Sequence, residues 1–180
     1  ENYARELMEL HTMGSDGGYT QRDVAELARA LTGWTIAGRG DFAFNAGLHD
    51  FGEKTILGRT IPAMPTTAGA RGIEDGEMVM EWLLDHPSTA RYLSTKMLRW
   101  LLWYEPTEAM VESVAATYAA TRGDIRAMVR ACLDQTYLGA APAKLKRPFH
   151  FLVSATRGLG VVTRRNVSTI NRQLASLGQP

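Results

Sequence analysis

The sequence predicts a mainly α-helical protein, built as an irregular array of several helices with one short irregular or β-ribbon insertion at about residues 35–72. Apolar residues recur at helical spacing on both sides of this insertion, whereas inside it the helical period disappears and Gly, Pro and Thr recur. A chain of 180 residues with 45% hydrophobic residues can bury one sizeable core. We therefore expect a single helical domain over residues 1–180, as a fragment of a longer protein.

The first two helices are predicted from apolar spacing and from a capping signal. Apolar residues at i, i+4 and i+7, from Tyr3 to Leu10, predict a helix that ends near Thr12, before a glycine-rich loop. Thr20, with Asp23 three residues later, predicts a capped start for the second helix, because a short hydroxyl accepts a hydrogen bond from a free amide of the first turn. The apolar stripe of this second helix consists of Val24, Leu27, Ala28, Leu31 and Trp34.

The insertion holds two runs with strand character. Residues 42–44 and 55–57 predict two short strands, which we expect to pair as one ribbon packed on the helices. Residues 62–72 predict an exposed loop, because Pro, Thr and Gly dominate there. A loop of this length is often functional.

Helices resume after the insertion, beginning with apolar positions at residues 78–83. Ser88, Thr107 and Asp124 predict the capped starts of three more helices. Pro148 predicts the first turn of another, because its ring already holds φ near the helical value, and a last helix follows near the C-terminus.

Composition excludes several classes of protein. The single cysteine, Cys132, excludes an internal disulfide framework and any zinc site built on several thiolates. No apolar run approaches the roughly 20 residues that a membrane-spanning helix needs. The sequence also contains no phosphate loop, nucleophile elbow or dinucleotide fingerprint.

Charge is distributed unevenly, although the net charge is only +1. Residues 1–120 carry 10 Lys/Arg against 17 Asp/Glu, and residues 121–180 carry 10 against 2, which gives −7 and +8. One interpretation is that the two parts neutralise each other, or that the basic part faces a missing portion of the parent protein. The other is an anion-binding surface for an acidic polymer, although no nucleic-acid motif is present and nucleic acid is the less favoured partner.

The first group of candidate catalytic residues lies on the first helix. Glu6 and Glu9 share its polar face, and His11 lies on a neighbouring face. Carboxylate and imidazole at helical spacing can hold a divalent metal or perform acid–base chemistry. The alternative is ordinary i, i+4 pairing of Arg5 with Glu1 and Glu9, with His11 capping the carbonyls at the helix end.

The second group lies in the insertion, where His49, Asp50 and Lys54 form a dense polar segment before a predicted strand. Loops held by a rigid scaffold are where functional residues concentrate. Alternatively, His49 and Asp50 only stabilise a turn through side-chain to backbone hydrogen bonds. If His11 and His49 converged with Asp50 and with Glu6 or Glu9, these residues would offer an oxygen-and-nitrogen site for a divalent metal.

Three stretches of the chain are distinctive, and they are ENYARELMELHTMG at 1–14, DGGYTQ at 16–21 and LARALTGW at 27–34. Further distinctive pieces are His49-Asp50, Gly52, Lys54, Leu57-Gly58, His86-Pro87, Thr89-Ala90, Lys96, Lys146 and Pro148-Phe149. In these pieces the chain resembles the large bacterial family called domain of unknown function 1800, and the resemblance covers essentially its whole length. The resemblance implies a longer, often exported protein, of which this chain is the middle and later portion, commonly encoded beside a second family of unknown function. It implies no activity, but it adds weight to both groups of candidate residues, Glu6, Glu9, His11, His49, Asp50 and Lys54.

The leading functional hypothesis is an accessory or interaction module of an exported or periplasmic bacterial protein. Its expected partners are the remainder of the parent protein and a protein of the cell envelope. The alternative is a hydrolase-like enzyme with a carboxylate–histidine site and possible divalent metal. A weaker alternative is binding of an anionic polymer by the basic C-terminal part.

Overall fold

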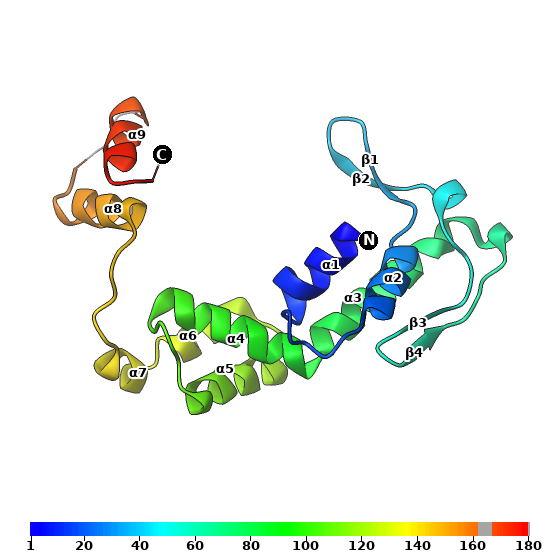
Figure 1. The fold of residues 1–180 in the computed structure, drawn as a ribbon, viewed down its shortest axis with the longest axis horizontal. Coiled ribbons are helices and arrows are strands. Elements are labelled where there is room, and N and C mark those ends of the chain that lie inside the picture. The colour runs from blue at the N-terminus through cyan, green and yellow to red at the C-terminus, as the bar shows by residue number, and fades with distance from the viewer. Residues whose placement is uncertain (162–166, 180) are drawn as a thin grey trace. The chain divides into compact units, whose positions relative to one another are not determined.

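The computed structural model describes residues 1–161 and 167–179, and it is mainly helical with two small two-stranded sheets (Figure 1). The predicted fold class is therefore confirmed. The chain divides into two compact units, an N-terminal unit over Glu1–Ala141 and a C-terminal unit over Pro142–Pro180. The expectation of a single domain stays a prediction.

The first helix has the predicted length but buries a different face. It consists of α1 (Asn2–Glu6) and a π-helical segment, η1 (Leu7–Thr12). Tyr3 and Leu10 are exposed, and the buried apolar residues are Ala4, Leu7 and Met8. The predicted stripe is therefore wrong at its two ends. At Leu10, the π-helical turn bonds i to i+5 and so shifts the side chain away from the regular α-helical period.

The second helix, α2 (Gln21–Ala30), begins as predicted. The Thr20 hydroxyl accepts from the Asp23 amide at 3.2 Å, and Asp23 Oδ2 accepts from the Thr20 amide at 2.7 Å. The other carboxylate oxygen accepts from the amide of Leu57 at 2.7 Å. Burial raises the pKa of Asp23, but these hydrogen bonds outweigh it and hold the pKa below its ordinary value. The cap therefore also fastens the insertion to α2.

The insertion contains both predicted strands, but the expected single ribbon is wrong. The structure has two separate antiparallel hairpins, which pair β1 (Trp34–Ala37) with β2 (Asp41–Phe44) and β3 (Lys54–Ile56) with β4 (Arg59–Ile61). Each strand pairs with its neighbour in sequence because a short turn brings the two together at little entropic cost.

The turn between β3 and β4 consists of Leu57 and Gly58, which both have positive φ, at 52° and 73°. Two residues in this conformation form the turn that matches the twist of a hairpin. The left-handed conformation is unfavourable for a leucine. Leu57 keeps it because its amide is bound by Asp23 and its side chain packs against the core.

The remaining helices of the N-terminal unit are η2 (Ala46–Leu48), η3 (Thr66–Gly72), α3 (Ile73–Asp85), α4 (Pro87–Leu101), α5 (Glu108–Thr121), α6 (Ile125–Cys132) and α7 (Gln135–Ala140). The predicted loop at 62–72 thus contains a 3-10 helix. Thr107 and Asp124 cap α5 and α6 as predicted. The cap of α4 is instead His86, whose Nδ1 accepts from the Ser88 amide at 3.2 Å, while the Ser88 hydroxyl donates to the Gly17 carbonyl at 2.9 Å.

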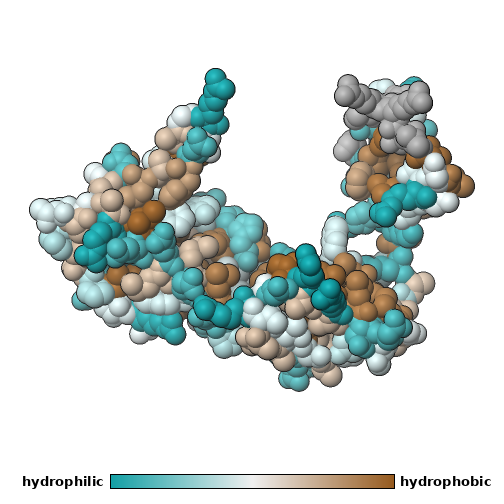
Figure 2. All heavy atoms as spheres, turned by 180° about the vertical axis from the view of Figure 1, so that it is seen from behind, coloured by the Kyte–Doolittle hydropathy of each residue, from teal (hydrophilic) through white to brown (hydrophobic). Residues whose placement is uncertain are grey.

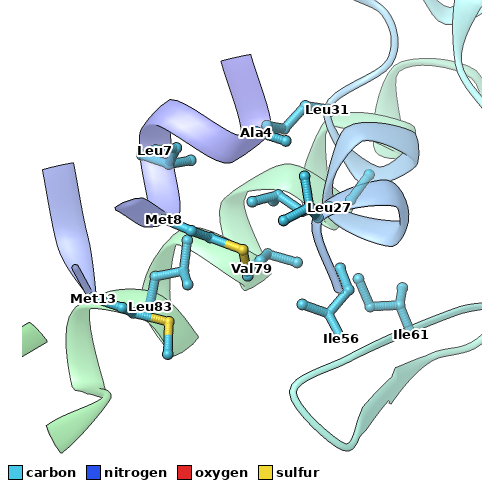
Figure 3. Packing of buried hydrophobic residues seen from close by; sticks show 12 residues of the cluster. Ala4, Leu7, Met8, Met13, Leu27, Leu31, Ile56, Ile61, Val79 and Leu83 are labelled. Atoms are coloured by element: carbon cyan, nitrogen blue, oxygen red, sulfur yellow. The ribbon is translucent and has the colours of Figure 1, made fainter. Parts of the chain in front are cut away.

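Two apolar clusters form the core of the N-terminal unit. The first joins the N-terminal helix, α2, α3 and the β3–β4 hairpin, and Figure 3 shows the end of the Met8 side chain beside Val79 of α3. The second joins α4, α5 and α6, with Leu98, Val114, Met128 and Cys132 fully buried.

The C-terminal unit contains α8 (Pro148–Gly158), with Pro148 in its first turn as predicted, and α9 (Val167–Ser176). The amide of Phe149 donates to the Gln179 side chain at 3.1 Å and so joins α8 to the residues that follow α9. Among the described residues of this unit, none is buried. No described helix of the chain is both long enough and apolar enough to span a membrane.

Candidate functional site

The structure brings together the candidate residues of the insertion and adds one that the sequence did not indicate. His49, Asp50 and Lys54 lie where the insertion meets α2 and α3, and Asp75 in the first turn of α3 completes the group. Nothing in the sequence distinguishes Asp75 from its neighbour Glu74, because acidic residues are common in the first turn of any helix. Only the tertiary contact with Lys54 gives it a role.

Lys54 is a fully buried cation whose ammonium is completely paired. Its side chain has 0% exposure, and Nζ donates to Asp75 Oδ2 at 2.7 Å, to the Gly52 carbonyl at 2.9 Å and to the Asp50 carbonyl. An ammonium has three donors, so the three acceptors satisfy it. A buried charge is tolerated only when it is paired and hydrogen-bonded in this way.

His49 is held from both sides of its ring. Nδ1 donates to the Thr32 carbonyl at 2.8 Å, and Nε2 lies 3.3 Å from Asp75 Oδ2. The ring of Phe51 packs edge-on at a centroid distance of 4.7 Å. Gly72 permits the approach of α3, because a Cβ atom there would lie 2.5 Å from His49 Cδ2. The side chain of His49 has 0% exposure, so it contacts only protein.

Asp50 lies nearer the surface, in a chain of ion pairs with α2. Arg29 Nε donates to Asp50 Oδ2 at 2.8 Å, and Arg29 Nη1 donates to Glu26 Oε2 at 2.8 Å. The hydrogen bond from Arg29 lowers the pKa of Asp50 to about 2, against a smaller opposing effect of burial. A carboxyl group with so low a pKa is a weak base, so Asp50 is poorly suited to accept a proton near neutral pH.

The candidates on the first helix do not join this group. Among the described residues, no hydrogen bond or ion pair links Glu6, Glu9 or His11 to the insertion, and His11 is exposed. The carbonyl of Leu10 near the helix end accepts from Lys96 Nζ at 3.0 Å. Lys96, and not His11, therefore supplies the cation at this helix end.

The alternative prediction for the first helix was that Arg5 pairs with Glu1 and Glu9, and the structure shows a different partner. Arg5 donates to Gln21 Oε1 at the start of α2, and within the described part of the chain it forms no ion pair with Glu1 or Glu9. The polar face of the first helix thus contributes to packing between α1 and α2.

No group of three or more His, Cys, Asp or Glu side chains among the described residues is arranged to hold a metal ion. At the insertion, Asp75 Oδ2 accepts from Lys54 Nζ and also lies beside His49 Nε2. Together with the ion pair between Arg29 and Asp50, these contacts fix the insertion between α2 and α3.

An open apolar groove of about 580 Å³ lies on another face of the N-terminal unit, between α1, α2 and the β1–β2 hairpin. Its lining includes Tyr3, Leu31 and Trp34, with the exposed side chains of Ile36 and Phe42 at the hairpin. Sequence reasoning missed this groove because it assigned Tyr3 to the core.

A family model described as "Protein of unknown function (DUF1800)" matches residues 1–180, the whole chain. No curated protein and no solved structure matches the chain. The comparisons therefore supply no activity, substrate or partner.

Proposed function

The chain belongs to the DUF1800 family of proteins of unknown function, and from this premise we propose that it is an interaction module that binds a partner rather than a catalyst. The observation that carries the proposal is the C-terminal unit, whose described residues include exposed apolar side chains and no buried one. Figure 2 shows this apolar surface beside hydrophilic residues on the unit.

The geometry of the insertion favours a structural role over catalysis. A general acid or base must come within hydrogen-bond reach of its substrate, either directly or through one water. His49 and Lys54 have 0% side-chain exposure, and their polar atoms are taken up by Asp75 and backbone carbonyls. A hydrolase-like reaction at these residues would require the insertion to leave α3 first.

The C-terminal unit supports binding because its helices do not bury their apolar residues. Phe149 and Phe151 of α8 are 48% and 54% exposed, and Leu159, just beyond the helix, is 79% exposed. A surface helix normally covers its apolar face with other elements, and exposed apolar patches on proteins mark interaction surfaces. The proposed setting is an exported bacterial protein, with the partner in the cell envelope.

Site-specific photo-crosslinking in cells tests the proposal. A photoreactive amino acid at Phe151 is expected to give an adduct with a partner, because this side chain is exposed on the proposed surface. The matched control is Glu112, an exposed position on α5 of the N-terminal unit, where no adduct is expected. If folded protein gives no adduct from Phe151 or from Phe149, the chain does not bind through this unit and the proposal fails.

A further inference from the structure

We propose that the C-terminal unit, residues 142–180, binds an anionic phospholipid surface by lying on it through its exposed apolar and basic side chains. This inference rests on the proposed function and names the chemical class of the partner. It is carried by the charge of the unit and by the kind of apolar residue that the unit exposes.

The charge of the unit has one sign only. Residues 142–180 contain seven Lys/Arg and no Asp/Glu, whereas residues 1–141 contain the other 13 Lys/Arg and all 19 Asp/Glu. A segment without any carboxylate cannot neutralise itself, so its field attracts anionic surfaces. A basic segment next to apolar residues is typical of proteins that bind anionic lipid headgroups.

Basic and apolar residues are interleaved along the described part of the unit. Lys144, Lys146 and Arg147 precede α8, and the exposed Leu145 stands among them. Arg157 lies at the other end of α8, in its last turn. Long cationic side chains at such positions can place their charge at the headgroups while their stems lie on the apolar layer.

The apolar residues favour lipid over nucleic acid. Phe149 and Val153 are four residues apart on α8, so they share one face, and both are exposed. Leu159 and Val161 continue the exposed apolar surface beyond the helix. Aliphatic side chains contribute little to nucleic-acid binding, which relies on stacking aromatics and phosphate contacts, but they are what an interfacial segment inserts among acyl chains.

The unit is suited to lying on a membrane rather than crossing it. α8 has 11 residues and α9 has 10, whereas a helix needs about 20 residues to span the hydrocarbon layer. An interfacial segment buries its apolar face only to the headgroup and acyl boundary, and it combines this burial with electrostatic attraction.

Vesicle co-sedimentation of the full chain tests the inference. The chain is expected to sediment with phosphatidylcholine vesicles that contain phosphatidylglycerol, and not with vesicles of phosphatidylcholine alone. The double substitution Lys146→Glu/Arg157→Glu is expected to weaken binding by at least about ten-fold, because it reverses two charges near the lipid surface. Phe149→Ser/Val153→Ser is also expected to weaken it, because both side chains are exposed on the face of α8 that is proposed to meet the lipid.

The matched control is Arg126→Glu/Arg130→Glu, which makes the same change in net charge on α6 of the N-terminal unit. It is expected to leave vesicle binding nearly unchanged, and circular dichroism checks that every variant retains its helix content.

Equal binding to neutral vesicles, no binding to either kind, or an equal loss in the α6 control would each overturn the inference. Binding only to heparin or to a second copy of the chain would overturn it too. If the chain binds no vesicles while a photoreactive residue at Phe151 crosslinks to a protein in cells, the proposed function as an interaction module is retained and only the proposed lipid partner is wrong.

Discussion

Replacing Lys54 by methionine is expected to cost a large part of the stability of the N-terminal unit. The substitution keeps a long apolar stem but removes the ammonium, which leaves Asp75, buried at 3% side-chain exposure, with only His49 Nε2 at 3.3 Å beside its carboxylate. It also removes the donor to the carbonyls of Gly52 and Asp50. Breaking a buried pair by removing one partner typically costs about 3–5 kcal/mol.

This loss is large compared with the total stability of about 5–15 kcal/mol that is usual for a protein. Urea unfolding followed by tryptophan fluorescence measures it, because Trp34 and Trp82 pack against the first core cluster. With an m-value of about 2 kcal/mol/M, a loss of about 4 kcal/mol moves the midpoint by about 2 M.

Two further variants separate the ion pair from general damage. Lys54→Met/Asp75→Leu removes both charges and is expected to recover part of the loss, because no charge then remains buried alone. Arg71→Gln breaks an exposed ion pair with Glu74 and is expected to leave the midpoint unchanged. A loss below about 1 kcal/mol for Lys54→Met would refute the assignment of a buried, fully paired lysine.

Three other predictions follow from close packing, a lowered pKa and burial. Gly72→Ala is expected to lower the free energy of unfolding, measured in urea, by about 1–3 kcal/mol, because the added Cβ would lie 2.5 Å from His49 Cδ2. The control is Gly139→Ala, which is expected not to lower it, because the space around Gly139 is open. The pKa of Asp50 falls from an ordinary 3.8 to about 2 on folding, so this group contributes stability that is complete above about pH 5 and is lost as the pH falls towards 2. Asp50→Asn should remove this dependence of the urea midpoint on pH, and an unchanged profile would contradict the prediction. Burial raises the pKa of the Cys132 thiol to about 11, so maleimide is expected to label this cysteine at pH 8 only after the protein unfolds. Rapid labelling of the native protein would show that the second apolar cluster, which contains Cys132, is open to solvent.

The candidate site was predicted from the sequence only in part. His49, Asp50 and Lys54 lie within six residues of one another, so the chain itself brings them near the same place. Their chemistry was not predictable, because it depends on Asp75, which is 21 residues from Lys54 and belongs to another element. Burial converts this group from a plausible reactive cluster into a paired and enclosed one.

The sequence by itself determined the features that depend on near neighbours. The helix starts at Thr20, Thr107 and Asp124 were predictable because each cap bonds an amide three residues away. The sequence also determined the contrast of charge between the two units. Only the tertiary structure decided that Lys54 pairs with Asp75, and that Lys96 binds the Leu10 carbonyl across 86 residues of chain. Such contacts depend on how whole elements pack, and local spacing carries no information about the partner that packing will supply.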